Sequence, residues 1–448
     1  MKKEKISFFS LLMISSALVV SIRNLPTISE MGLKMIFFGL VSAVCFFIPI
    51  ALSSAELATG WPKLGGVYAW VKVALGEKWG MFASWLQWSY MTISVIAMVY
   101  FIAGSLAFVF APHFASNRLF LAIVSLTIVW LFTFLNLKGI KATSLISTLG
   151  FLAGVLFPGL LIITLAIIYL VQGNPVELDL SLTKDNLIPK LDYLPNLVLL
   201  IGFMRAFARI EASSSHANLV KNPRKNFPLV ILLVVIFGLT INIIGSLSVA
   251  SVVSKDKISL IAGIMEAFTV FFGKFHIAWV VPIMAVLVAS GQMGGVSTWL
   301  IGPVKGLLAT ARDGNLPPFF SKVNKHDVPV RLLILQGFIV SAITLFLLRF
   351  PSINIAFWIS VALSMMIYVS MYFLMLLSTL VLRYKMPDVE RAYRIPFGKM
   401  GVWIVTGIGM LTMVFAFIIA IFPPAELPSR NHTLYISFLL ISITIYMV

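Results

Sequence analysis

The chain has 448 residues, of which 60% are hydrophobic and only 11% are charged, and its formal net charge at pH 7 is +17. Soluble globular proteins have about a quarter charged residues, so the polar side chains here are too few to cover a water-soluble body of this size. The basic residues are scattered through short connections between apolar segments, which argues against a nucleic-acid-binding protein and for a membrane protein that contacts anionic lipid.

Apolar runs recur along the chain with roughly the 20-residue length that an α-helix needs to cross ~30 Å of hydrocarbon. They lack the alternating pattern of a barrel strand. We therefore predict an all-α membrane protein with twelve transmembrane helices, at residues 8–28, 34–57, 81–110, 118–137, 146–171, 193–215, 229–253, 277–304, 331–349, 353–381, 401–422 and 432–448.

The distribution of Lys and Arg predicts the orientation in the membrane. Most of these residues lie in the N-terminal segment and in the connections that follow the second, fourth, sixth, eighth and tenth spans. Because basic loops stay on the cytoplasmic side, both termini are predicted to be cytoplasmic. Segment 258–273 would then lie outside as a lid over the outer mouth, and the amphipathic segment 59–79 would lie along the inner surface.

The first span is interrupted by the sequence Ser-Ile-Arg-Asn-Leu-Pro-Thr at residues 21–27. Pro26 removes a backbone donor and disfavours helix at the preceding residue, so an unwound segment is expected. Unwound backbone at membrane depth is tolerated only where it faces protein or a water-filled cavity. The half-helix after the break would direct its N-terminus at a carboxylate, with Arg23 as a second anchor. The alternative is a proline kink in which Arg23 snorkels or pairs with Glu30.

The sixth span carries Arg205, Arg209 and Glu211 near its centre. The two arginines are four residues apart and share a face if the segment is helical. Three charges at this depth predict an aqueous cavity, mutual pairing or both. Glu211 would couple to Arg209 or to a proton; the alternative is an ion network that only stabilises the break.

The two interruptions open corresponding groups of five spans, which predicts a substrate site between inverted repeats. The repeats would be residues 1–171 and 193–381, followed by two peripheral spans at 401–448. In the eighth span, Ser297 and Thr298 are candidates to line a substrate path, and the neighbouring glycines permit close helix packing. The five histidines are isolated and no phosphate-binding glycine loop occurs, so neither an enzyme nor a cofactor is predicted.

Several short motifs resemble a known family over nearly the whole chain. The most specific are EASSSH at 211–216, NPRKNFP at 222–228 and WLIGPVKG at 299–306; supporting motifs are AELA at 55–58, GGVYAW at 65–70, VPV at 328–330 and FPP at 422–424. With these motifs the chain resembles the amino acid–polyamine–organocation superfamily, and within it the bacterial glutamate/GABA antiporter group.

The resemblance implies a five-plus-five inverted repeat with broken first and sixth helices and two additional helices. It also implies that the unwound segments hold the backbone of an amino-acid substrate, that spans three, eight and ten supply the walls, and that transport proceeds by alternating access. The candidate substrate-binding residues are Ile22, Arg23, Asn24, Leu25, Pro26, Thr27, Phe207, Ala208, Arg209, Glu211, Gly295 and Thr298.

Three positions depart from the antiporter group. The run at Arg23 to Leu25 replaces an aromatic and acidic run, Arg209 replaces a glycine, and Gly295 replaces an acidic residue. The added positive charge and the lost negative charge disfavour a cationic substrate and favour a neutral or acidic amino acid. We predict an antiporter of the bacterial inner membrane, with a proton-coupled symporter or a transport-inactive amino-acid sensor as alternatives; the sequence gives no oligomeric state.

Overall fold

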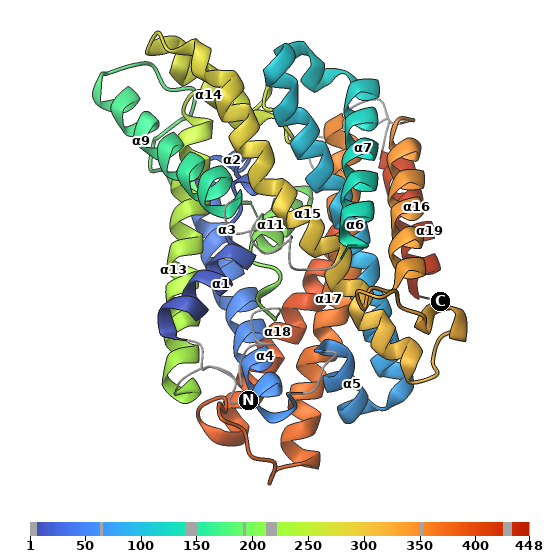
Figure 1. Cartoon of the computed structure of the whole chain (residues 1–448). Helices are drawn as coiled ribbons and strands as arrows, with labels where there is room; N and C mark the ends of the chain where they lie inside the picture. The colour runs from blue at the N-terminus through green and yellow to red at the C-terminus, as the bar shows by residue number, and fades with distance from the viewer. Residues whose placement is uncertain are drawn as a thin grey trace.

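The computed structural model describes residues 7–62, 66–138, 150–190, 194–211, 222–349, 353–423 and 432–447. Within these ranges every regular element is a helix, which confirms the predicted all-α fold class (Figure 1). The main helices are α1 (Phe8–Val19), α2 (Leu25–Ser29), α3 (Met35–Val41), α4 (Ile48–Gly60), α5 (Val67–Leu75), α6 (Glu77–Phe110), α7 (Arg118–Asn136), α9 (Phe157–Val171), α11 (Leu194–Ala206), α13 (Pro223–Ala250), α14 (Gly263–Lys274), α15 (Val281–Arg312), α16 (Val330–Leu347), α17 (Ile353–Lys385), α18 (Gly398–Ala420) and α19 (His432–Met447).

Nine helical segments in the described part of the chain are long and apolar enough to cross a membrane. The remaining predicted spans contain the shorter apolar helices α11 and α19 and the divided first span, α1 with α2. Boundaries differ from the prediction by several residues: α13 begins at Pro223, because proline is well suited to the first turn of a helix. The division into repeats at 1–171, 193–381 and 401–448 stays a prediction.

Helices α6 and α17 occupy the centre of the bundle and α18 its surface. In the apolar windows of α6 and α17, 83% and 78% of the residues are buried, against 33% in α18. Helix α15 runs along α6 and crosses the π-helical segment η5 (Leu152–Leu156) at two glycines. A Cβ atom on Gly154 would overlap the Gly291 backbone, so the two backbones meet at a distance that only glycine permits.

The first span is broken where the sequence predicts. Helix α1 ends at Val19, Ser21 is extended with φ −149° and ψ 127°, and a short 3₁₀ turn, η1 (Ile22–Asn24), precedes α2. Pro26 lies in the first turn of α2, where its missing N–H removes no helical hydrogen bond. The predicted interruption is therefore confirmed.

The sixth span is also interrupted. Helix α11 ends at Ala206, residues 207–209 form a turn, and helical backbone resumes at Ile210. Arg209 has φ 86°, a conformation that a side chain with a Cβ adopts only when its surroundings impose it. The break falls between the two arginines of this span, so they do not lie on one continuous helix face.

The segment predicted as a lid packs on the first break. A Cβ atom on Gly263, the first residue of α14, would lie 3.1 Å from Pro26 Cβ. The carbonyl oxygen of Ile261 approaches Gly104 of α6 so closely that a Cβ atom there would lie 3.0 Å from it. Asn354 of α17 accepts a hydrogen bond from the Leu260 N–H at 3.3 Å. We call this end of the bundle, at the top of Figure 1, the α14 end.

The opposite end, where α5 lies in Figure 1, is the α5 end. Here Lys72 Nζ lies 2.6 Å from Asp313 Oδ2, and the Tyr68 hydroxyl donates to the same oxygen at 2.5 Å. These donors lower the pKa of the Asp313 carboxyl. The contact between α5 and the end of α15 is therefore complete at neutral pH and is lost only as the pH falls through this lowered pKa, below the ~3.9 of an unperturbed aspartate.

A buried ion network lies in the same half of the bundle. Glu56 Oε2 accepts hydrogen bonds from Arg383 Nη2 at 2.9 Å and from the Ile395 N–H at 2.8 Å. Arg391 Nε lies 3.5 Å from Glu56 Oε1, and its Nη2 donates to the carbonyl oxygens of Leu382 and Met386. The network holds the connection between α17 and α18 against α4.

We predict that Glu56→Gln lowers the free energy of unfolding by about 3–5 kcal/mol, because two buried arginines lose their counter-charge. Thermal unfolding of the detergent-purified protein measures this. The control is Asp327→Asn, which breaks an exposed pair with Arg312 (3.2 Å) and should cost under about 1 kcal/mol. Equal shifts in the two variants would contradict a structural role for the Glu56 network.

Candidate substrate-binding site

The two helix breaks lie side by side in the bundle. Gly202 of α11 faces Thr27 of α2: a Cβ atom on Gly202 would lie 3.0 Å from Thr27 Cγ2 and 3.5 Å from the Trp358 ring of α17. Segments that are some 180 residues apart in the chain thus meet at the centre of the protein. Their proximity places the unwound backbone against protein rather than lipid, as membrane burial requires.

Aromatic rings from two other helices hold the arginines of the breaks. Trp299 of α15 lies beside two arginines: the Cζ of Arg23 is 5.6 Å from the ring centroid and the Cζ of Arg209 is 4.6 Å from it. The Cζ of Arg205 lies 5.5 Å from the centroid of Phe357 in α17. Ring faces attract cations, and the attraction is stronger away from water. The three arginines, at most 7% exposed, form what we call the arginine cluster.

The arginine cluster is rich in hydrogen-bond donors without partners. Nε and Nη1 of Arg23 and Nε and Nη2 of Arg205 are buried and make no hydrogen bond to any residue that the structure describes. The side-chain amide nitrogen of Asn24 and the hydroxyl of Thr27 are also buried without a partner among these residues. Arg205 and Arg209 also lie close enough to Arg23 for their like charges to repel it. Buried donors and excess positive charge together suit an anionic group such as a carboxylate.

Glu211 contacts tyrosines rather than forming an ion pair with Arg209. Its two carboxyl oxygens lie within hydrogen-bond distance of the Tyr368 and Tyr372 hydroxyl oxygens of α17, each at 2.6 Å. The Tyr372 oxygen also accepts the backbone N–H of Arg209 at 2.9 Å. Tyr368 stacks on Tyr90 of α6 with ring centroids 3.7 Å apart. The break in the sixth span is thereby attached to α17 and, through the stacked rings, to α6.

Four of the predicted binding residues direct their side chains into helix packing. Ile22 lies against Gly159 of α9, Leu25 against Gly245 of α13, Phe207 against Gly238 of α13, and Pro26 against Gly263 of α14. Their contribution to the site is the irregular backbone they belong to. The carbonyl oxygen of Ala208 accepts a hydrogen bond from Arg209 Nε at 3.2 Å.

The eighth-span candidates lie on α15 next to Trp299. Gly295, one turn before Trp299 on the same face, is adjacent to Met98 of α6, and a Cβ atom on it would lie 3.3 Å from Met98 Cε. The side chain of Thr298 is outside what the structure describes, as are residues 212–221 that follow Glu211.

The residues that sequence reasoning did not select are the aromatic ones: Tyr90, Phe357, Trp358, Tyr368 and Tyr372. Tyr368 and Tyr372 could have been selected from the sequence, because two hydroxyl groups one turn apart within an apolar span need polar partners. Trp299 appeared in the sequence only as part of a family motif. The predicted contributions of spans three, eight and ten correspond to α6, α15 and α17, which supply these rings.

Comparisons with known proteins agree with this architecture. The family model described as amino acid permease matches residues 6–445. An uncharacterised transporter of Legionella pneumophila is 36% identical over 438 residues, covering 98% of this chain and 94% of that protein. The glutamate/gamma-aminobutyrate antiporter of Lactococcus lactis subsp. lactis is 35% identical over 453 residues, covering 99% of this chain and 89% of that protein.

A solved structure supports the fold. The crystal structure of MhsT in complex with L-phenylalanine matches with a TM-score of 0.61 at 15% sequence identity, covering 93% of this chain and 100% of that one. This likeness concerns the fold alone and agrees with the predicted all-α membrane fold. With a family match over almost the entire sequence and relatives more than a third identical over nearly full length, this multi-pass membrane protein is a transporter, not an enzyme, and belongs to the amino acid permease family.

Proposed function

We propose that this permease is an antiporter that exchanges an acidic or neutral amino acid across a bacterial inner membrane by alternating access, with both termini in the cytoplasm. The observation that carries the proposal is the set of buried donors at the junction of the two broken helices that have no partner in the described part of the chain. The antiporter names of Lactococcus relatives 35% identical to this chain support exchange. The excess of Lys and Arg at one face of the predicted topology supports the orientation.

In this proposal the substrate α-carboxylate binds to Arg23, Asn24 and Thr27 of the first break. Within the described residues, all three have a buried side-chain donor without a partner. Arg205 offers Nε and Nη2 to a second carboxylate, which favours an acidic amino acid. Glu211, Ile22, Leu25, Pro26, Phe207, Ala208, Arg209, Gly295 and Thr298 would shape the remainder of the site through their backbone, packing or charge.

The contacts of Glu211 favour a step that involves a proton. Three close oxygen–oxygen contacts join the two carboxylate oxygens and the two tyrosyl oxygens, the last pair at 2.5 Å. Two hydroxyl groups supply only two hydrogens for three contacts. A protonated Glu211 supplies the third. Such a proton would accompany exchange, or would drive uptake if the protein is a symporter.

Uptake of labelled amino acid into proteoliposomes tests the proposal. We expect uptake to require, or to be strongly stimulated by, unlabelled amino acid inside the vesicles. The reason is that an antiporter changes between its outward-facing and inward-facing conformations only with substrate bound. Equal uptake into empty vesicles, increased by an inward proton gradient, would replace antiport by symport. Binding of amino acid without uptake in either condition would favour the sensor.

Arg23→Ala should weaken substrate affinity roughly 10- to 100-fold, since a hydrogen bond to a charged group contributes about 1.5–3 kcal/mol. The measurement is ligand-induced thermal stabilisation of the purified protein, with retention of the folded state checked by gel filtration. Arg312→Ala, which removes an exposed arginine, serves as the control and should leave affinity unchanged. Unaltered affinity in Arg23→Ala would remove this residue from the site.

Arg205→Gln should selectively weaken binding of glutamate relative to glutamine, because the two ligands differ only in the group that Arg205 would contact. The expected loss for glutamate is roughly tenfold or more, with glutamine little changed. Competition for uptake in proteoliposomes measures both affinities. Arg331→Gln is the matched control, since Arg331 also lies over a phenylalanine ring, that of Phe319, but away from the site. An equal loss for both ligands would show that Arg205 has only a structural role.

A further inference from the structure

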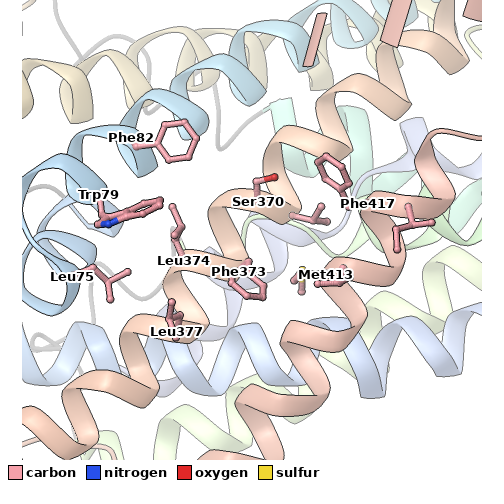
Figure 2. Close-up of a pocket in the computed structure, with 12 residues that line it drawn as sticks. Leu75, Trp79, Phe82, Ser370, Phe373, Leu374, Leu377, Met413 and Phe417 are labelled. Carbon is pink, nitrogen blue, oxygen red and sulfur yellow. The ribbon is translucent and has the colours of Figure 1, made fainter. Parts of the chain in front are cut away.

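An apolar groove lies on the surface of the bundle, away from the arginine cluster. It has a volume of about 520 Å³ and is formed by α17 and α18 on one side and by the start of α6 with the end of α5 on the other. Figure 2 shows Trp79 and Phe82 on the α6 side, and Phe373 and Met413 among the residues from α17 and α18. The volume is within the range of ligand sites in proteins.

The chemistry of the lining excludes a polar ligand. Ser370 contributes the one hydroxyl among the lining side chains, and it already donates to the Met366 carbonyl oxygen at 2.9 Å within its own helix. At the rim, Trp79, Val414 and Ile418 are each about half exposed. In a membrane protein such a surface faces lipid, so the substance in contact with the groove is hydrocarbon.

The groove continues toward a cluster typical of the membrane interface. Tyr384 follows Phe373 by eleven residues on α17, and Trp403 precedes Val414 by eleven on α18, so each pair lies on one helix face about three turns apart. The Trp403 indole N–H donates to the Tyr384 hydroxyl at 2.9 Å, and Lys399 Nζ lies 4.8 Å from the centroid of the Tyr384 ring. Trp, Tyr and Lys in this arrangement mark the level of lipid headgroups.

Two exposed lysines lie on helices that form the groove, Lys78 on α6 and Lys399 on α18. Lys78 immediately precedes Trp79, and Lys399 lies beside Tyr384. Neither forms an ion pair within the described residues, whereas Glu77 and Asp313 nearby are already bound to Lys72. Phe373 and Tyr384 are separated by about 16 Å along the three turns of α17. This separation is close to the hydrocarbon thickness of one leaflet, which is half of the ~30 Å of the bilayer core. The positions of Lys399 and of the groove therefore match a headgroup with its acyl chain.

We propose that this groove is a binding site for an anionic phospholipid, with one acyl chain between α6, α17 and α18 and the headgroup at Lys399. In the orientation proposed above, the lipid belongs to the cytoplasmic leaflet. The site is separate from the substrate site, but both use α17, whose residues 368 and 372 hold Glu211.

Photolabelling of the full-length protein in lipid nanodiscs tests the site. The probe is phosphatidylglycerol with a photoreactive diazirine in one acyl chain, compared with phosphatidylcholine that carries the same chains. We expect labelling of the peptides that contain Phe373 and Met413 to exceed, by several-fold, that of the exposed surface of α7. Even labelling around the perimeter would show contact with bulk lipid only and would overturn the proposal, as would cross-links from the groove to a second copy of the chain.

Two sets of variants separate the acyl chain from the headgroup. Ser370→Phe fills the groove and should reduce groove labelling several-fold, whereas Thr412→Phe should not, because Thr412 also bonds its own helix but does not line the groove. The variant Lys399→Gln should reduce labelling by phosphatidylglycerol to the level of phosphatidylcholine. Equal labelling by both lipids in the unaltered protein would refute the headgroup assignment, and unchanged labelling in a folded Ser370→Phe would refute the groove.

Discussion

A buried guanidinium group must find a counter-charge, hydrogen-bond acceptors or a π face, because an uncompensated charge inside a membrane-embedded bundle costs several kcal/mol. In this protein the arginine cluster depends mainly on π faces. Trp299 lies beside Arg23 and Arg209, and Phe357 lies beside Arg205. Ring faces compensate part of the charge and leave the N–H groups available. This requirement determines which helices must surround the two breaks, since the rings come from α15 and α17.

The Glu56 network shows how the same chemistry is arranged when binding is not required. There Arg383 and Arg391 meet a carboxylate, and their Nη2 groups also donate to backbone carbonyl oxygens. In the described part of the chain, arginines of both sets keep some N–H groups without a partner, but only Arg383 and Arg391 have a carboxylate beside them; Arg23 and Arg205 at the breaks have none. Both environments are buried, so burial alone does not distinguish them. The difference lies in the acceptors, and it separates a structural ion network from a site suited to an anion.

The strained backbone at Arg209 has an identifiable support. Its φ of 86° is unfavourable for a residue with a Cβ atom, and its N–H is bound by the Tyr372 hydroxyl, which also contacts Glu211. The break in the sixth span and α17 are therefore connected by hydrogen bonds rather than by apolar packing alone. Because hydrogen bonds are directional, a change in the protonation of Glu211 or in the position of α17 would be transmitted to the irregular backbone beside the arginine cluster.

Much of the fold could be predicted from the sequence. Hydropathy identified the helical class, because lipid admits no other backbone arrangement for long apolar runs without strand periodicity. Both breaks were predicted, since the effects of Pro26 and of charges within a span act over a few neighbouring residues. The inward location of Arg23 followed from the cost of placing it in lipid, and the buried side chain agrees.

The composition of the candidate site was decided by the tertiary structure. Within irregular segments no helical period indicates which side chains face inward, and Ile22, Leu25 and Phe207 in fact pack against α9 and α13. Tyr90, Phe357, Tyr368 and Tyr372 belong to long apolar helices in which aromatic residues are common, and their role depends on which residues of distant segments lie opposite. The sequence by itself therefore determined where the membrane helices break, because those causes are local. Only the packing of α6, α15 and α17 around the breaks decided which rings and hydroxyl groups meet the charges, because those contacts join residues far apart in the chain.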